Sequence, residues 1–220
     1  MRKEIVQLCA VLITVGLLAP PALGGAFEPA VMVATNIAGD VSVQSASGAR
    51  RVLVTTQVLH SGDVLTTADN SLAVVRLADV GKVTLGPATT AATFSNGTDL
   101  SLQLSAGTLC VQSERPLVSI NAGSVTVAAT VRSSIFNLEQ NNGDTKMAVY
   151  RGTVSAATPD HATTLRAGAA AASAPGVDVH SIPLASIHED FAALNCPDAS
   201  VVNSVLPQRT AQPLEAAPHT

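Results

Sequence analysis

The stretch "HSGDVLTTADNSLAVVRL" (His60–Leu77) contains the pattern that decides the fold. Gly62 and Asp63 precede a short run of valine, leucine and threonine, and a second apolar run, Leu72–Leu77, follows. Glycine supplies the positive φ angle of a turn, and an aspartate beside it can hydrogen-bond to its own backbone. Calcium needs several oxygen ligands from one loop, and this loop offers too few acids. We therefore interpret Gly62-Asp63 as the corner between two strands.

The same order of residues recurs along the chain: a glycine, a mostly polar residue, and then an apolar residue with alternation behind it. The other five segments begin at Gly39, Gly81, Gly107, Gly123 and Gly152. Alternation with period two places successive side chains on opposite faces of a strand. Further strand candidates lie between these segments, at Arg51–Val54, Leu72–Leu77, Leu100–Leu104, Leu117–Ile120, Ile135–Glu139 and Lys146–Tyr150.

These segments predict about a dozen short strands between Asn36 and Arg166, with almost no helical periodicity. The intervals between the leading glycines vary, whereas a strict solenoid holds a fixed period. With four phenylalanines, one tyrosine and no tryptophan, the core must come from aliphatic residues, many of them β-branched. We predict an all-β fold, either an irregular β-solenoid-like roll or a two-sheet β-sandwich.

The pattern changes after Arg166. The segment "AGAAAASAPG" resembles a flexible connector, and residues 171–205 are predicted to form a linker and one short helix. That C-terminal helix is expected within Pro183–Asn195, because apolar residues recur there at helical spacing: Leu184, Ile187, Phe191 and Leu194. The polar, proline-containing residues 206–220 are predicted to be a disordered tail.

The first 26 residues have the order of a secretory signal peptide. Arg2 and Lys3 precede a short apolar run, and small residues follow Pro20-Pro21. Cleavage is expected after Gly24 or Ala26, with a retained membrane anchor as the alternative; the apolar run is shorter than a bilayer span needs. The predicted location is therefore periplasmic or secreted, with no membrane span after cleavage.

The charge of the mature chain argues against nucleic-acid binding. Residues 1–26 hold two of the 12 cations and one of the 16 acids. The mature chain then has ten cations and fifteen acids, and a net negative surface does not attract phosphate backbones.

No catalytic, cofactor or metal site is predicted. Nucleophile-elbow, P-loop, dinucleotide and HExxH motifs are absent from the sequence. His60 and Ser61 are adjacent, so on a strand they would point to opposite faces. The remaining histidines have no metal-ligand spacing on a predictable element: His161, His180, His188 and His219. We therefore predict that the protein is not an enzyme.

Two cysteines remain in the mature chain, Cys110 and Cys196. Export places them in an oxidising compartment, where an even pair tends to close into a disulfide. Such a bond would attach the C-terminal helix to the β-sheet body. The alternative is that Cys110, between Leu109 and Val111, is a small buried hydrophobic residue.

The order of the motifs resembles the FecR family of exported β-rich domains. Five segments carry the resemblance: "AGDVSVQ" (38–44), "VLHSGDVLTTADNSLAVVRLADVGKVTLGP" (58–87), "LQLSAGTLCV" (102–111), "MAVYRGTVSAA" (147–157) and "TLRAGAA" (164–170). The similarity covers residues 33–170. One segment departs from it: "RSSIFNL" (132–138) keeps Arg132 and Phe136 of the family's R-G-T-x-F step but replaces its glycine and threonine.

The resemblance implies an extracytoplasmic domain. Fuller family members carry a cytoplasmic anti-sigma segment and a membrane helix, whereas this chain is expected to start with an export signal and to have no later membrane helix. The resemblance therefore does not imply direct control of a sigma factor. We expect a non-enzymatic binding or sensing module of the bacterial cell envelope that contacts a protein partner through an exposed strand edge. The alternative is a structural scaffold associated with the cell surface or with a polysaccharide.

Overall fold

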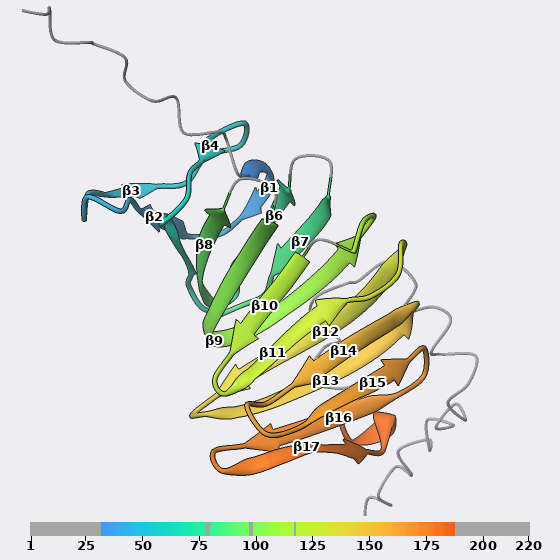
Figure 1. Cartoon of the computed structure of the whole chain (residues 1–220). Coiled ribbons are helices and arrows are strands. Elements are labelled where there is room, and N and C mark those ends of the chain that lie inside the picture. The colour runs from blue at the N-terminus through green and yellow to red at the C-terminus, as the bar shows by residue number, and fades with distance from the viewer. Residues whose placement is uncertain (1–31, 78–79, 97–98, 117, 188–220) are drawn as a thin grey trace, which may run out of the picture.

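The computed structural model describes residues 32–77, 80–96, 99–116 and 118–187, and Figure 1 shows them as a stack of strands running from the N-terminal end to the C-terminal end. Seventeen strands and one 3-10 helix lie in these residues. No helix among them is long and apolar enough to cross a membrane. The predicted signal peptide and the tail at 206–220 lie outside the described residues.

The strands form two facing sheets that share one strand, β9 (Asp99–Ser113). Sheet A contains, in spatial order, β4 (Val58–Leu59), β1 (Met32–Ala38), β6 (Leu72–Leu77), β7 (Gly81–Leu85), the second half of β9, β12 (Ser134–Asn141), β13 (Asp144–Arg151), β16 (Ala170–Ala174) and β17 (Val177–Ile182). Sheet B contains β3 (Arg50–Val52), β2 (Val41–Gln44), β5 (Val64–Thr67), β8 (Thr90–Asn96), the first half of β9, β10 (Val118–Ala122), β11 (Val125–Ala129), β14 (Thr153–Ala157) and β15 (Ala162–Arg166).

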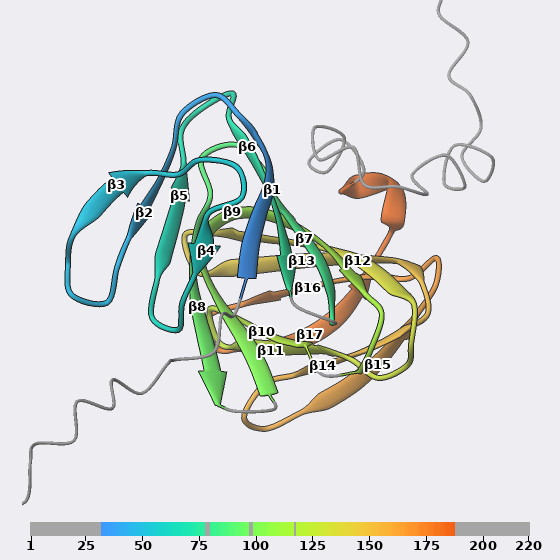
Figure 2. The same cartoon turned by 90° about the horizontal axis from the view of Figure 1, so that it is seen from above.

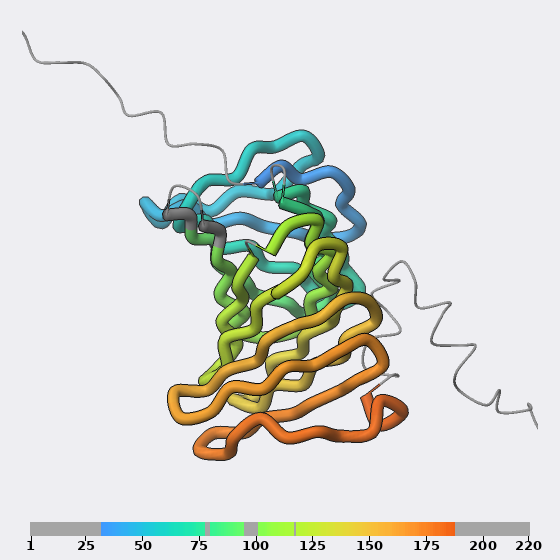
Figure 3. The backbone as a smooth tube through the Cα atoms, turned by 45° about the vertical axis from the view of Figure 1, so that its right-hand side comes forward, coloured from blue at the N-terminus to red at the C-terminus, as the bar shows by residue number. Residues whose placement is uncertain are grey.

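The chain fills the two sheets in alternation. From β10 onward, consecutive antiparallel hairpins lie in sheet B (β10–β11), sheet A (β12–β13), sheet B (β14–β15) and sheet A (β16–β17). Figure 3 shows these layers as successive turns of the backbone. β9 and β10 pair in parallel, and the other strand pairs of the described residues are antiparallel. The predicted all-β, roll-like two-sheet architecture is confirmed, with more strands than the dozen expected.

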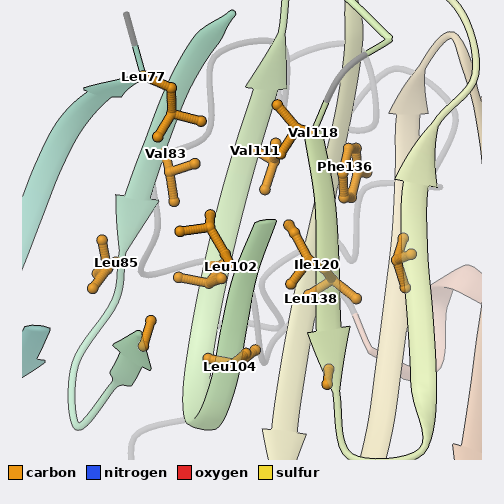
Figure 4. Close-up of a cluster of buried hydrophobic side chains, with 14 of the residues drawn as sticks. Leu77, Val83, Leu85, Leu102, Leu104, Val111, Val118, Ile120, Phe136 and Leu138 are labelled. Atoms are coloured by element: carbon orange, nitrogen blue, oxygen red, sulfur yellow. The ribbon is translucent and has the colours of Figure 1, made fainter. Parts of the chain in front are cut away.

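The core lies between the two sheets and is built from the alternating apolar positions. In β11, for example, Val125, Val127 and Ala129 are buried while Thr126 faces solvent. Figure 4 shows how side chains from both sheets meet at the centre, where Phe136 is fully buried among leucines and valines. One buried cluster extends from Met32 near the N-terminal end to Val179 in β17.

β9 changes sheets at Gly107. Its residues Asp99–Ala106 pair with β8 in sheet B, and Gly107–Ser113 pair with β12 in sheet A. Gly107 has a φ of +90°, and a Cβ atom there would lie 2.5 Å from the Cα atom of Thr89. A residue with a side chain therefore meets both an unfavourable backbone conformation and a steric clash at this bend.

The structure corrects the prediction of a flexible connector after Arg166. β16 and β17 occupy residues 170–182 and form the last hairpin of sheet A. The sequence "AAASA" does not alternate in polarity, but Ala171 and Ala170 are both buried, one on each face of the strand. A strand covered on both faces loses the alternation that identifies a half-exposed strand.

The predicted C-terminal helix is described only at its start. Leu184–Ser186 form a 3-10 helix, η1, rather than the first turn of an α-helix. Ile187 after it is buried. The rest of the predicted helix, up to Asn195, lies outside the described residues.

Candidate interaction surface

Each of the glycines that begin the repeated segments has a positive φ angle: Gly39, Gly62, Gly81, Gly107, Gly123 and Gly152. The structure places Gly62-Asp63 at the turn between β4 and β5. The Asp63 carboxylate accepts a hydrogen bond from the His60 N–H at 3.0 Å, and the Asp63 N–H donates to the His60 carbonyl at 3.1 Å. The opening motif is thus a reciprocally bonded corner, in which the acid stabilises the backbone.

The same aspartate reaches across to the edge of sheet B. The Arg51 guanidinium lies 3.7 Å from Oδ2 of Asp63, and Asp63 is almost completely buried. Arg51 belongs to β3, which is the outermost strand of sheet B. The Gly-Asp corner therefore helps to fix the position of the edge strand.

β3 leaves one side of its backbone without a strand partner among the described residues, because its ladder runs only to β2. Ser45 N–H donates to the Ala49 carbonyl and Leu53 N–H donates to the Val41 carbonyl, so the odd-numbered residues of this segment bond to β2. In an antiparallel ladder the bonded positions alternate. The backbone groups of Arg50 and Val52 therefore face outward from the sheet.

Valines gather at this edge. Six large hydrophobic residues are exposed in the described part of the chain. Three of them lie within seven residues of one another: Val52 (74% exposed), Val54 (58%) and Val58 (40%). We call β3 together with Val54 and Val58 the N-terminal edge. Figure 2 shows the β2–β3 hairpin extending away from the body of the molecule.

The loop of the N-terminal edge is held in a defined conformation. Leu53 is buried, the Val54 N–H donates to the Gln57 side chain at 3.2 Å, and the Thr56 N–H donates to the Ala34 carbonyl at 2.7 Å. The Ala34 N–H in turn donates to the Gln57 carbonyl. These bonds attach the loop to β1, so the exposed valines belong to an ordered surface.

A shallow cleft of about 250 Å³ adjoins the edge on the outer face of sheet B. It is lined by Asp40, Val41, Ser42, Arg50, Val52, Thr66 and Ala68. The Arg50 guanidinium donates two hydrogen bonds to the Ser42 hydroxyl, at 3.2 Å and 3.0 Å. The cleft thus offers an apolar side chain, a cation and an anion within one small depression, which suits a side chain of a bound peptide.

A second cleft of about 160 Å³ lies on the outer face of sheet A. Its lining includes Lys82, Glu114 and Arg151 together with Ser133 and Ser134. The described residues contain no group of three histidine, cysteine or acidic side chains placed to hold a metal ion. His60, His161 and His180 are exposed; His188 and His219 lie outside the described residues.

Cys110 is fully buried on β9 and is disulfide-bonded. Cys196 lies outside the described residues, so the pairing of the two cysteines stays a prediction.

The sequence pointed to an exposed strand edge but did not identify it. The strand predicted at Arg51–Val54 overlaps β3. The valines of this strand alternate like those of the buried strands, so the alternation does not mark them as exposed. The available signal was the pair of adjacent arginines, Arg50-Arg51, because charged residues are typical of edge strands.

Residues 63–155 match the model of the FecR protein family. The N-terminal edge precedes this segment. Two crystal structures of a candidate anti-sigma factor from Parabacteroides distasonis ATCC 8503, at 2.50 Å and 1.65 Å resolution, each have 12% identity to this chain and a TM-score of 0.48. The match covers 55% of this chain and only 59% of theirs. No curated protein matches the sequence. The chain is therefore similar to the FecR family over residues 63–155, as its motifs predicted.

Proposed function

We propose that this protein is an exported, non-enzymatic binding domain of the bacterial envelope that takes a protein partner at its N-terminal edge. The observation that carries the proposal is the open side of β3, where outward backbone groups and the exposed Val52 and Val54 lie together. Strand addition combines these two features, because backbone hydrogen bonds supply affinity and side-chain contacts supply specificity.

The charges at the edge favour an extended segment with an acidic residue. Arg50 is exposed, and Arg51 is only partly neutralised by the buried Asp63. Two adjacent arginines discourage self-association of identical edges while remaining attractive to an acidic partner strand. The similarity to the FecR family supports a regulatory role, and the predicted signal peptide supports an envelope location.

The test is a binding experiment with the mature protein and envelope extracts, followed by titration of the purified candidate partner. Replacing Val52 and Val54 together by aspartate should weaken binding by at least about tenfold, since the exposed apolar contacts are lost and the new carboxylates repel an acidic partner strand. Val177→Asp is the matched control, because Val177 is an exposed valine on β17 at the opposite end of the molecule. Equal binding by both variants would contradict the proposed site.

The outer face of sheet B favours a second candidate function, a scaffold that contacts a polysaccharide. Neighbouring strands place Gln103, Asn121 and Thr126 in one row, all exposed and uncharged. The Thr126 hydroxyl donates to the Asn121 side chain at 2.8 Å. Such a flat polar row suits sugar hydroxyl groups. Retention on cell-wall or polysaccharide material, lost in Asn121→Ala and unchanged in Val52→Lys, would support this alternative. Substrate turnover that a single substitution abolishes would overturn both functions.

A further inference from the structure

The outer face of sheet A contains a row of side chains that are buried although they point away from the core. They occupy paired positions on five neighbouring strands: Thr84, Cys110, Asn137, Ala148 and Ala170. Each is at most 5% exposed. We call these five residues the outer row. Their neighbours along each strand, such as Leu109 and Val111 on β9, point into the core.

The outward-pointing residues of sheet B are more exposed than the outer row of sheet A. This contrast indicates that another segment covers the outer row. Outward-pointing residues in the middle of sheet B, such as Gln103 and Thr126, are exposed. A sheet face that packs against nothing stays open to water in this way. The outer row of sheet A must therefore lie beneath another part of the structure.

Part of the cover is described. Cys110, Ile135, Ala148 and Ala170 form a second buried cluster with Ile187, and Ile182, Leu184 and Tyr150 pack against it. The segment after β17 thus turns back onto the outer face of sheet A. Ile187, the last described residue, is seated in this cluster.

Asn137 indicates that the cover also supplies a hydrogen-bond donor. Its side-chain N–H donates to the Tyr150 hydroxyl at 3.1 Å, while its Oδ1 atom is buried without a partner among the described residues. An unpaired buried acceptor costs on the order of 1–3 kcal/mol. A backbone N–H or a polar side chain from the covering segment would remove that cost.

The chain beyond Ile187 can reach the whole outer row. Cys196 follows nine positions later, a segment that spans up to about 30 Å when extended. β9, which carries Cys110, is four strands from β17, or about 19 Å at the usual strand spacing. Phe191 and Leu194 add apolar side chains at the spacing of Leu184 and Ile187. Cys110 is itself disulfide-bonded.

We propose that residues 188–205 of this chain lie across the outer row of sheet A and are fixed there by a disulfide between Cys110 and Cys196. The bond forms when both thiols lose their protons and transfer two electrons to the disulfide of an envelope thiol oxidoreductase, which is reduced to two thiols. The outer row is then an internal interface. A partner must bind away from it, although the proposal does not depend on the N-terminal edge being the site.

Disulfide mapping of the oxidised full chain tests the covalent part. Digestion without reductant should give one peptide pair that joins Cys110 to Cys196, and the mature protein should contain no free thiol. Two free thiols, a bond from Cys110 to Cys9, or a bond between two molecules would overturn the proposal.

Labelling of single introduced cysteines in the oxidised chain tests the cover. Ala148→Cys lies in the outer row, and Ala128→Cys is the matched control, an outward-facing alanine on β11 of sheet B. The cysteine at 148 should react with a maleimide at least about tenfold more slowly than the cysteine at 128, because labelling must await local opening. Equal rates, in protein with a native circular dichroism spectrum, would show that the face is open and would overturn the proposal.

Discussion

Asp63 connects three features of sheet B at the level of a single residue. Its carboxylate caps the turn at His60 and lies beside Arg51 of the edge strand. Its carbonyl accepts a hydrogen bond from the Thr93 N–H of β8 at 3.0 Å. A buried acid is tolerated here because a backbone donor and a cation are both within reach. The aspartate of the predicted turn thus also orders the edge where we place the partner.

Replacing Asp63 tests that role. Asp63→Ala should lower the free energy of unfolding by about 1–3 kcal/mol, because the His60 N–H loses its acceptor. Urea denaturation followed by circular dichroism measures the change. Asp69→Ala is the control, since Asp69 is exposed on the next turn and its side chain makes no hydrogen bond or ion pair among the described residues. A loss as large at Asp69 as at Asp63 would contradict the capping role.

Tyr150 offers a second test, because it is the one tyrosine of a chain without tryptophan. Burial raises the pKa of its phenol above 10.0, and the hydrogen bond from Asn137 opposes part of that shift. The phenol of the folded state therefore keeps its proton up to a higher pH than the phenol of the unfolded state does. Stability that is fully present below the unfolded pKa must be lost as the pH rises through the folded pKa.

Ultraviolet absorbance of the phenolate measures this pKa directly. The titration midpoint of the native protein should lie above that of the urea-unfolded protein. Tyr150→Phe should remove both the signal and its share of the alkaline loss of stability. A native midpoint at or below the unfolded one would show that Tyr150 is not desolvated.

At the level of elements, the bend in β9 joins the two sheets through one glycine. Gly107 combines a left-handed backbone with close contact to Thr89, whereas Gly176 in the β16–β17 turn has a φ of +74° and open space around its Cβ position. Gly176→Ala should therefore cost about 1 kcal/mol for the backbone conformation alone. Gly107→Ala should cost clearly more, about 3 kcal/mol, because the strands must also separate. Equal losses in chemical denaturation would show that the contact with Thr89 is unimportant.

The elements also show where sequence patterns succeed and fail. Alternation between glycine turns correctly predicts strands such as β11 and β14, because one side of each faces the core and the other is more polar. The pattern fails at β16, where alanines with weak strand preference are buried on both faces. Whether a strand is covered depends on segments distant in sequence, and a local pattern does not contain that information.

The sequence predicted that the candidate site is an exposed strand edge, but it did not predict which strand forms that edge. Val52 and Val54 have the same alternation as the buried Val41 and Val43. Their exposure follows from the end of the sheet at β3, which is a property of the sheet order. The turn glycines, in contrast, depend on local backbone geometry and could be located from the sequence alone.

At the level of the whole molecule, the continuous core determines how the protein should unfold. Repeat proteins whose units contact only their neighbours can lose structure one unit at a time. Here the buried cluster is continuous from Met32 to Val179, and β9 belongs to both sheets. We therefore expect one cooperative unfolding transition for the described residues, although the strands are layered like a solenoid.

Two core truncations at different levels of the stack test this cooperativity. Phe136→Ala, at the centre, should cost about 3–5 kcal/mol, and Val43→Ala, near the N-terminal end, about 2 kcal/mol. In both variants the urea transition seen by circular dichroism should coincide with the one seen by Tyr150 absorbance, which reports on β13. Val177→Ala, at an exposed valine, should change the midpoint little. If Val43→Ala shifts the circular dichroism transition but leaves that of Tyr150 in place, the N-terminal strands unfold independently. The N-terminal edge would then be a separate unit that a partner could order or release without disturbing the rest of the molecule.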